Sequence, residues 1–317
     1  MRIGQNPSKS SKEVAQPERI TVAVLNYIPF LSGYYAEGLD VLKVCLKSAR
    51  TDPGLPFDLM VFDNGSCSEV QNELVRLHQA GEIQFLILSE KNLGKGGAWN
   101  IIFSGAPGEL IAYADSDVLF YPGWLAKSVE ILETYPNVGM VTARPFRTPE
   151  KFSSATIQWA ETTPEANYQV GQFLTWEEFS SFDLSLGRTL EETQARYKDE
   201  HDLRTRYHNV PTAIGASHWQ FLTRKATMQQ FLPFEMSRPM GQVRQLDQRM
   251  NEQGLLRLMT ADCLAQNMSN TLPAEFRGGR KMPESARPVG IKRRLANLRV
   301  VRFGLLYLYD RIFRLYN

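Results

Sequence analysis

Short apolar runs alternate with amphipathic patterns over the first half of this chain. Runs typical of buried strands are expected at residues 20–25, 57–62, 83–88, 110–114 and 138–143. Between them, apolar positions at helical spacing predict helices at 39–49, around Leu74 and Leu77, at 98–103 and at 125–132. This alternation predicts an α/β fold with a mostly parallel, Rossmann-like sheet flanked by helices.

The regular alternation ends near Arg144-Pro145. Residues 146–212 form a polar, aromatic-rich stretch that we expect to be irregular, apart from a charged helical pattern over 190–206. Strand character returns at 216–223 and at 255–264, on either side of a helix that carries Val243, Leu246 and Met250 on one face. We therefore expect four parts: a disordered segment 1–18, two halves at 19–145 and 146–275, and a helical tail at 276–317.

Composition excludes some classes of protein. A net charge of +2 over 317 residues gives no argument for a nucleic-acid partner. The three cysteines are not at metal-ligand spacing and favour a reducing, cytoplasmic setting. Residues 1–18 lack the apolar core of a signal peptide, and no apolar run reaches the roughly 18 residues of a membrane span.

The last forty residues are markedly basic. Lys292-Arg293-Arg294 precedes a basic amphipathic pattern that predicts the helical tail. Two interpretations of this tail stay open. It binds an anionic surface peripherally, at the inner face of the plasma membrane, or it packs on the rest of the protein or on a partner.

Two carboxylates follow the buried run at 110–114. Asp115 and Asp117 are two positions apart in an extended segment, so they point the same way. Like charges held together favour a cation between them, and oxygen ligands suit Mg²⁺ or Mn²⁺, often shared with substrate phosphates. The alternative interpretation is a polar turn after a strand.

Two further motifs follow predicted strands. In Asp63-Asn64-Gly65-Ser66, Asp63 can accept hydrogen bonds from a base or a ribose, while Ser66 and Glu69 predict a capping box for the next helix. The glycine-rich stretch from Asn92 to Asn100 leads into a helix, and its spacing excludes both a P-loop and a dinucleotide fingerprint. Its Lys95 either neutralises a phosphate or is a solvated loop lysine.

Taken in order, these motifs resemble the family 2 glycosyltransferases, which are nucleotide-sugar-dependent enzymes of the GT-A fold. The resemblance rests on Asn26-Tyr27, on Asp63-Asn64, on Asn92, Gly94, Ala98 and Asn100, and on Asp115-Ser116-Asp117. It covers residues 20–143 closely and 216–264 loosely. It implies that residues 19–145 bind the nucleotide sugar, and that residues 146–275 bind the acceptor and supply the catalytic base.

The resemblance also implies roles for single residues in the first half. Asn26 and Tyr27 line the nucleoside pocket, and Asp63 contacts the base. Asn92, Gly94 and Lys95 lie near the ribose and phosphates, Asp115 contacts the ribose or metal-bound water, and Asp117 ligates the Mn²⁺ or Mg²⁺.

In the second half the chain departs from the family pattern. Asp247 stands where the family has a catalytic carboxylate, but Gln245 and Leu246 precede it in place of the usual acidic pair. The helix face of Val243, Leu246 and Met250 independently leaves Asp247 beside apolar residues, a setting that suits a general base. The alternative is a surface Asp in a charged run.

The metal and acceptor sites also have candidates. Asn267 stands where many relatives have a metal-binding histidine, and its oxygen is a weaker third ligand. His218 is either a substrate-pocket residue or a structural histidine. Aromatic residues that either stack on acceptor sugars or pack locally are Trp159, Trp176, Trp219 and Tyr168.

These features predict a metal-dependent glycosyltransferase of glycan or polysaccharide biosynthesis, with an inverting mechanism favoured over a retaining one. The donor is a UDP-, GDP- or dTDP-sugar, and the acceptor is a hydroxyl of a glycan or lipid-linked molecule. A non-catalytic nucleotide-sugar binder or scaffold of the same fold is one alternative. A sugar-phosphate nucleotidyltransferase is another, but it needs a basic glycine-rich loop after the first strand, where this chain has Asn26-Tyr27-Ile28-Pro29-Phe30.

Overall fold

The computed structural model describes residues 4, 6, 14–236 and 243–277. The predicted basic tail from 278 onward and most of the segment 1–18 therefore lie outside the described residues. No helix within the described ranges is both long enough and apolar enough to cross a bilayer.

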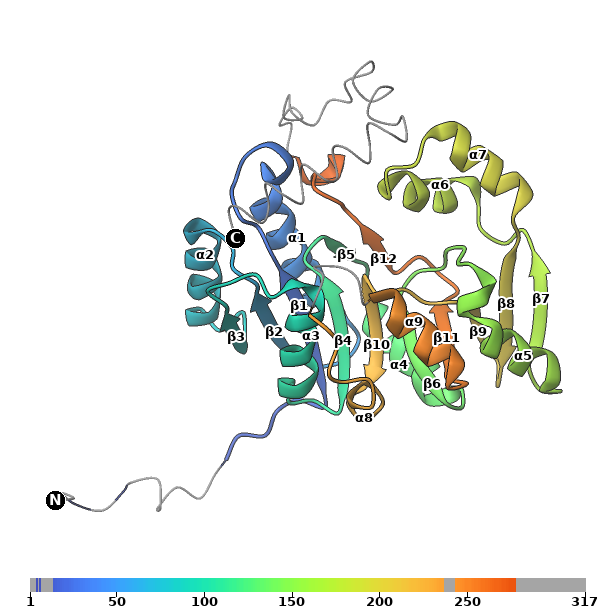
Figure 1. The fold of residues 1–317 in the computed structure, drawn as a ribbon, viewed down its shortest axis with the longest axis horizontal. Helices are drawn as coiled ribbons and strands as arrows, with labels where there is room; N and C mark the ends of the chain where they lie inside the picture. Colours follow the sequence, from blue (N-terminus) through green and yellow to red (C-terminus); the bar gives the residue numbers. More distant parts are fainter. Residues whose placement is uncertain (1–3, 5, 7–13, 237–242, 278–317) are drawn as a thin grey trace.

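A ten-stranded sheet runs through the molecule in the order β3-β2-β1-β4-β10-β6-β11-β9-β8-β7 (Figure 1). Its strands are β1 Ile20–Asn26, β2 Asp58–Asp63, β3 Phe85–Leu88, β4 Leu110–Asp115, β6 Val138–Thr142, β7 Asn167–Gly171, β8 Asp202–Tyr207, β9 Val210–Ile214, β10 Gln220–Arg224 and β11 Leu256–Thr260. A separate pair joins β5 Val118–Phe120 to β12 Ala265–Asn267.

The α/β fold class is confirmed, and parallel pairing is concentrated in the first half. Strands β3, β2, β1 and β4 pair in parallel, as do β6 and β11. Strand β10 enters between β4 and β6 antiparallel to both, and β9, β8 and β7 continue the sheet antiparallel. Because β10 belongs to the second half of the chain, the two halves expected on either side of residue 145 share one sheet.

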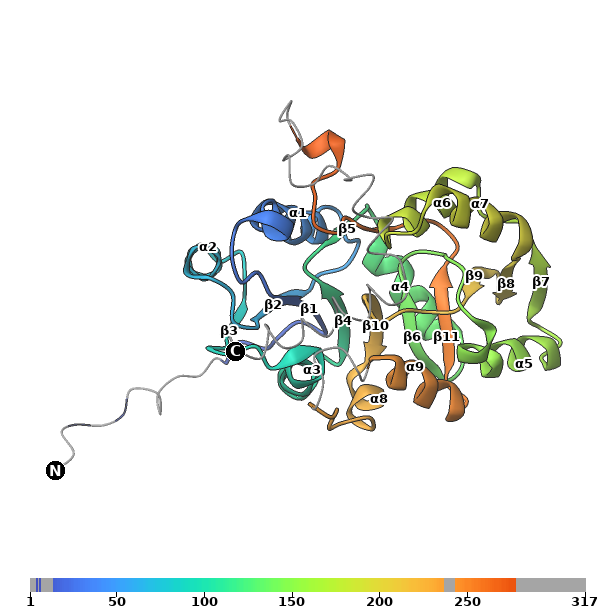
Figure 2. The ribbon, with the colours of Figure 1, turned by 45° about the horizontal axis from the view of Figure 1, so that its top comes forward.

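Helices cover both faces of this sheet (Figure 2). Residues of β1 alternate between the faces, with Val22 and Val24 in the core on one side and Ala23 and Leu25 in the core on the other. Helices α1, α2 and α4 pack on the first face, and α3, α8 and α9 on the second. The helices are α1 Gly38–Arg50, α2 Ser68–Gln79, α3 Gly94–Gly105, α4 Trp124–Thr134, α5 Ser154–Thr162, α6 Trp176–Ser185, α7 Leu190–Asp199, α8 Lys225–Gln229 and α9 Val243–Glu252, with short 3₁₀ turns η2 Gly33–Tyr35, η3 Glu150–Phe152 and η4 Ala274–Phe276.

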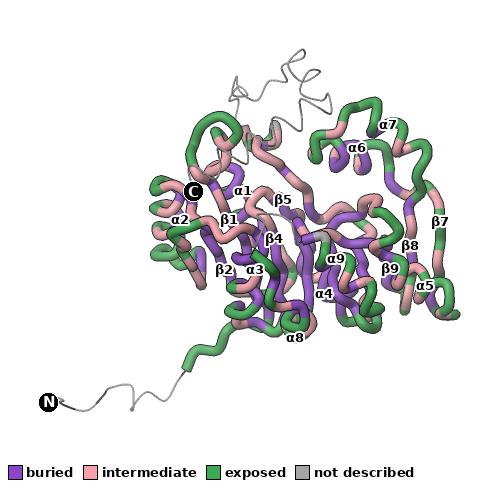
Figure 3. Tube along the Cα trace, in the orientation of Figure 1, coloured by how far each residue is buried: buried purple, intermediate pink, exposed green. Residues whose placement is uncertain are grey.

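The stretch 146–212 was expected to be irregular, and this expectation is wrong. It contains three helices and the antiparallel strands β7, β8 and β9. The charged helical pattern over 190–206 is helical only to Asp199, and β8 begins at Asp202. Figure 3 shows the central strands buried and β7 with α7 largely exposed. An edge strand and a half-exposed helix bury few side chains, so their apolar periodicity is weak.

One buried tyrosine fastens this antiparallel part to the parallel part. The Tyr135 hydroxyl, just after α4, donates to the Val210 carbonyl at 2.7 Å and accepts from the Tyr207 N–H at 3.1 Å and the Thr212 hydroxyl at 3.2 Å. Its ring also packs on Trp159 and Tyr207. Trp159 is thereby placed in local core packing.

We predict that Tyr135→Phe lowers the free energy of unfolding by about 1–3 kcal/mol, because it leaves buried hydrogen-bonding groups of β8 and β9 without their partner. Urea unfolding measures the change. The matched control is Tyr168→Phe, which removes a hydroxyl that has no hydrogen bond within the described part of the chain and should change the unfolding free energy by less than about 0.5 kcal/mol. Equal losses in the two variants would contradict the assigned role of the Tyr135 hydroxyl.

Candidate functional site

A cavity of about 360 Å³ lies beyond the carboxyl ends of β1, β2 and β4. Ligands of open α/β sheets bind at this edge. The cavity brings together six residues predicted from the sequence: Tyr27, Asn92, Gly94, Lys95, Asp115 and Asp117. It also contains residues that the sequence did not single out: Tyr34, Tyr35, Ser116, Ser269 and Asn270, with Asn64 from a motif already noted.

Asn26 and Asp63 form a buried network behind this cavity. The Asn26 amide donates to Asp63 Oδ1 at 2.8 Å, and Asp63 Oδ2 accepts from the Ser66 N–H and the Gln71 side chain. Both residues are fully buried. The expectation that Asp63 is free to bind a ligand is not met in this arrangement, and its contact with a base stays a prediction.

Ser66 does not cap the following helix, so the predicted capping box with Glu69 is wrong. Helix α2 begins at Ser68 with Cys67 at its N-cap and no capping side chain. The Ser66 hydroxyl instead accepts hydrogen bonds from the Asn26 side chain and from the Ile28 N–H. Burial of the Asn26–Asp63 pair recruits this hydroxyl, since buried polar groups need partners.

An asparagine clasp joins the loops that follow β2 and β3. The Asn64 amide donates to Asn92 Oδ1 at 2.9 Å, and Asn64 Oδ1 accepts from the Leu93 N–H. Asn92 Oδ1 also accepts from the Gly94 N–H at the start of α3. Gly65 permits this approach, because at its φ of +88° a Cβ would lie 3.0 Å from the Lys91 backbone. The clasp sets the position of the first turn of α3 against the cavity.

Lys95 is a buried cation that faces Asp115. Its side chain is 7% exposed, and its Nζ lies 2.7 and 2.8 Å from the two carboxylate oxygens of Asp115. The Tyr113 hydroxyl donates to Asp115 Oδ1, and the Lys95 ammonium lies over the rings of Trp99 and Tyr113. The alternative of a solvated loop lysine is therefore wrong in this structure.

Asp117 lies deeper than Asp115. One of its oxygens, Oδ1, is buried without a hydrogen-bond partner among the described residues. Burial, together with the charge of Asp115, raises the pKa of Asp117 to about 7, although the Lys95 ammonium lowers it. A carboxylate in this position is poised to accept a further cation.

Asn267 lies beside Asp117, but its oxygen is already used. Its side chain makes a hydrogen bond to Asp117, while its Oδ1 accepts from the Ser269 N–H at 2.7 Å. The Met268 N–H also donates to the Asp117 carbonyl. In this arrangement Asn267 orients Asp117, and metal ligation by Asn267 stays a prediction.

The donor set fits a hard divalent cation. Asp115 and Asp117 offer carboxylate oxygens, the type of ligand that Mg²⁺ and Mn²⁺ prefer, and the unpartnered Asp117 oxygen is available. Within the described ranges no group of three or more His, Cys, Asp or Glu residues could hold a metal ion. A cation held here would therefore take further ligands from substrate or water.

The segment after β12 closes one side of the cavity. Ser269 and Asn270 line it, and the Asn270 amide donates to the Tyr34 carbonyl at 2.9 Å. Beyond them, Arg277 pairs with both oxygens of Glu37 at 2.7 and 2.8 Å. These contacts between residues more than 230 positions apart left no local sequence signal.

The predicted base, Asp247, lies on α9 and is 7% exposed. Its Oδ1 is 2.8 Å from Arg257 Nη2, and its Oδ2 is 3.3 Å from His218 Nδ1. Arg257 is 1% exposed and also donates to the carbonyls of Ala216 and Phe152. The alternative of a solvated surface Asp is therefore wrong, and Arg257 is a partner that the sequence did not suggest.

Pairing of β4 with β10 places His218 near the carboxylate pair. The Asp115 N–H donates to the Trp219 carbonyl at 2.9 Å, and His218 is the preceding residue. Trp219 itself is 7% exposed and packs on Phe182, so its ring belongs to the core and not to an open sugar platform. The sequence candidates His218 and Asp247 thus come together at the same edge as Asp115.

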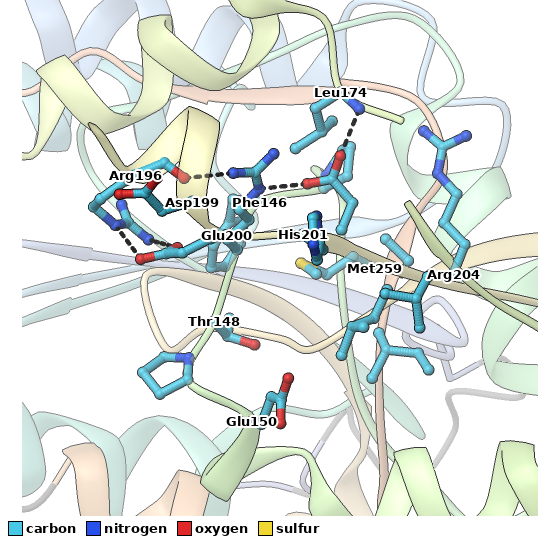
Figure 4. Close-up of a pocket in the computed structure, with 18 of the residues that line it drawn as sticks. Phe146, Thr148, Glu150, Leu174, Arg196, Asp199, Glu200, His201, Arg204 and Met259 are labelled. Atoms are coloured by element: carbon cyan, nitrogen blue, oxygen red, sulfur yellow. Dashed lines mark hydrogen bonds and ion pairs between the residues drawn. The ribbon is translucent and has the colours of Figure 1, made fainter. Parts of the chain in front are cut away.

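A second, larger cavity of about 620 Å³ lies over β8, β9 and β11 (Figure 4). Its walls come from the loop 145–150 and the segment 196–204, and Met259 of β11 lies among them. Met259 is two positions from Arg257 on the same strand, so both side chains face the same side of the sheet. The Met259 side chain in the cavity and the Arg257 side chain that pairs with Asp247 therefore lie on the same face of the sheet, although Arg257 and Asp247 do not line the cavity.

The polar lining of this second cavity combines four arginines with four carboxylates. Arg147 pairs with Asp202 at 2.6 Å, and Arg196 pairs with Glu200 at 2.8 Å. Arg204 stacks on Phe173 and has no carboxylate partner within the described part of the chain. Of the aromatic residues predicted for an acceptor site, Trp176 instead packs on Tyr197, and neither Trp176 nor Tyr168 lines the cavity.

The fold and this site define a class: an α/β protein with a carboxylate pair at the carboxyl edge of its sheet. The model of the family described as Glycosyl transferase family 2 matches residues 33–223. The chain belongs to this family. The match confirms the resemblance inferred from the sequence motifs, and it agrees with the GT-A type of fold.

The individual proteins that the chain resembles share less than 30% of their residues with it. The chain is 29% identical over 123 residues to an uncharacterized glycosyltransferase of Nostoc sp., a match that spans 39% of this chain and 35% of that protein. The mannosyltransferase PcManGT from Pyrobaculum calidifontis, solved with GDP-Man and Mn²⁺, is 14% identical with a TM-score of 0.46, over 80% of this chain and 57% of that one. S. aureus TarS 1–349 is 14% identical with a TM-score of 0.43, over 77% of this chain and 58% of that one. Likenesses at this level carry no argument about the site.

The raised pKa of Asp117 predicts a pH-dependent cost to stability. Since the pKa is about 7 in the folded protein and ordinarily 3.8, the folded state should lose stability as pH rises through this window. We expect Asp117→Asn, in buffer with EDTA, to be more stable than wild type at pH 8 by at least about 1 kcal/mol. This corresponds to about 2 °C in Tm, and the advantage should disappear near pH 4.

Scanning calorimetry at pH 4 and pH 8 measures the effect. Asp262→Asn is the matched control, since this carboxylate lies outside the cavity and should show no such pH dependence. If Asp117→Asn is less stable than wild type at pH 8, the ionised Asp117 carboxylate does not destabilise the folded protein, and the prediction is wrong.

Proposed function

We propose that this protein is a metal-dependent, inverting glycosyltransferase that moves a sugar from a nucleotide-diphospho-sugar to an acceptor hydroxyl. The observation that carries the proposal is the cavity at the carboxyl edge of β1, β2 and β4, where Asp115, Asp117 and Lys95 converge in a member of glycosyl transferase family 2. The proposal includes a UDP-, GDP- or dTDP-sugar as donor and a glycan or lipid-linked acceptor.

The donor half of the site supplies charges for a diphosphate. Asp117, with Asp115, would hold Mn²⁺ or Mg²⁺, which would act as a Lewis acid on the leaving diphosphate. Lys95 offers a second cation on the same wall, 2.7 Å from Asp115. Tyr27, Tyr34 and Tyr35 offer aromatic surface for the nucleoside.

The acceptor half supplies the base. Asp247 is proposed to supply the carboxylate that acts as general base. Arg257 holds this carboxylate on the same face of the sheet as the second cavity. That cavity of about 620 Å³ is large enough for a saccharide, and we place the acceptor in it. A direct displacement at the anomeric carbon then forms the glycosidic bond and inverts its configuration.

The strongest alternative is a non-catalytic nucleotide-sugar binder of the same fold. The ion pair of Asp247 with Arg257 would serve equally as a structural pair in such a protein. The two functions differ in one measurable respect: the binder takes up the nucleotide sugar without releasing a nucleoside diphosphate. A nucleotidyltransferase is disfavoured, since the segment after β1 carries Tyr27 and Ile28 in place of a basic glycine-rich loop.

Calorimetric titration of UDP, GDP and dTDP and their sugars, with Mn²⁺ and with EDTA, tests the donor site. We expect one nucleotide class to bind, at least about tenfold more tightly with Mn²⁺. Asp117→Asn should abolish this metal dependence, and Asp262→Asn should retain it. Absence of binding by every member of the panel, with the protein folded, would overturn the proposal.

Lys95→Met tests the second cation. Loss of the ammonium should weaken binding of the nucleoside diphosphate by about 10- to 100-fold, because a charge-assisted contact to phosphate is lost. Binding of the corresponding nucleoside, which carries no phosphate, should not change. Lys91→Met, an exposed lysine four positions earlier, is the control. Equal affinity of wild type and Lys95→Met would show that Lys95 only neutralises Asp115.

A further inference from the structure

Each carboxylate oxygen of Asp247 faces a nitrogen of a basic side chain, although Oδ1 accepts no hydrogen bond within the described residues. Oδ1 faces the Arg257 guanidinium at 2.8 Å, and Oδ2 faces His218 Nδ1 at 3.3 Å. Asp247 is only 7% exposed and its Oδ2 faces the more exposed His218, so a substrate hydroxyl reaches the histidine more readily than the carboxylate.

His218 has the exposure that Asp247 lacks. Its side chain is 27% exposed, compared with 10% for the side chain of Asp247. Its Nδ1 faces Asp247, and no hydrogen bond to its other ring nitrogen, Nε2, occurs within the described ranges. The carbonyl of the next residue, Trp219, accepts a hydrogen bond from the Asp115 N–H, so the backbone at His218 lies close to that of the carboxylate pair.

We infer that His218 is the catalytic base that contacts the acceptor hydroxyl, and that Asp247 and Arg257 are positioning residues behind it. This inference rests on the proposed transferase function. It changes the role of Asp247 from direct base to the carboxylate that orients and charges a histidine. A base held by a third group is a recurrent arrangement in enzymes. The 3.3 Å separation is long for a hydrogen bond, as such contacts often are without substrate.

Every proton and electron pair in the proposed transfer step can be followed. Neutral His218 carries its proton on Nδ1, which it donates to Asp247 Oδ2, and the lone pair on Nε2 takes the proton of the acceptor hydroxyl. The acceptor oxygen forms a bond to the anomeric carbon, while the bond from that carbon to the diphosphate oxygen breaks. The electron pair leaves with the nucleoside diphosphate, and the imidazolium later returns its proton to water.

The buried side chain of Arg257 explains how Asp247 can stay charged and orient His218. An isolated carboxylate at 7% exposure is costly, and Arg257 offsets its charge. Arg257 is itself fixed by the carbonyls of Ala216 and Phe152. Among the described residues, His218 thus contacts the carboxylate of Asp247 from α9, and Arg257 from β11 lies on the other side of that carboxylate.

Release of nucleoside diphosphate from the nucleotide sugar that binds, with water or simple glycosides as acceptors, tests the inference. We expect His218→Gln to lower kcat by about 10²–10³-fold, in the range of a lost general base, with the KM for the donor unchanged within about twofold. Added imidazole should raise the activity of His218→Ala by at least tenfold. It should not restore Asp247→Asn, in which the histidine is present but no longer oriented.

His208→Gln is the matched control, because His208 lies in the exposed turn between β8 and β9 and should retain wild-type kcat. If His218→Gln keeps kcat within about threefold of wild type while Asp247→Asn is inactive, Asp247 is the direct base and the inference is overturned. Loss of donor binding in His218→Gln would equally overturn it in favour of a substrate-binding role.

A second measurement needs no substrate and separates this inference from the proposed function. The chain has four histidines, so ¹⁵N-histidine NMR can be assigned by comparing wild type with His218→Gln. Neutral His218 should carry its proton on Nδ1, and Asp247→Asn should change its ¹⁵N shifts. A proton on Nε2 in wild type would overturn the inference, whether or not any nucleotide sugar is turned over.

Discussion

The pairing of β4 with β10 is the constraint on which both parts of the site depend. Strand β10 comes from the second half of the chain but lies antiparallel between β4 and β6, so that Gln220 pairs with Ala114. Its first residues therefore stand at the carboxyl end of β4, where Asp115 emerges. One backbone hydrogen bond, from the Asp115 N–H to the Trp219 carbonyl, fixes the carboxylate pair relative to His218.

Charge compensation then determines what this edge can hold. Asp115 is neutralised by Lys95 and by the Tyr113 hydroxyl, whereas Asp117 keeps a buried oxygen without a partner. Asp247 is neutralised by Arg257. Asp115 thus has Lys95 at both of its oxygens, whereas Asp117 keeps a buried oxygen with neither a hydrogen bond nor a cation, a pattern that suits an external cation. Buried polar groups elsewhere at this edge, such as Asn26 and Asp63, satisfy each other.

Much of the fold could be predicted from the sequence because its first half consists of buried parallel strands and amphipathic helices. Helix α1 was expected at 39–49 and spans Gly38–Arg50, and β4 was expected at 110–114 and spans Leu110–Asp115. The strands β7 and β8 could not be predicted, because a half-exposed pair of strands at the edge of the sheet carries polar residues on both faces. Among the site residues, Asp115 and Asp117 could be predicted from their spacing. Arg257 could not, because a single arginine among the apolar residues of a predicted strand does not show which carboxylate it will contact.

The pattern around Asp247 predicts the burial of a candidate base but not the residues that it contacts. The apolar face of Val243, Leu246 and Met250 correctly placed Asp247 beside the core, and all three side chains are buried. A buried carboxylate, however, needs a nearby cation, and its burial keeps it away from a substrate hydroxyl. The deeper Asp247 lies, the more it depends on Arg257 and the less accessible it is to substrate. A more exposed group in contact with it, here His218, is then the natural place for the proton to be exchanged.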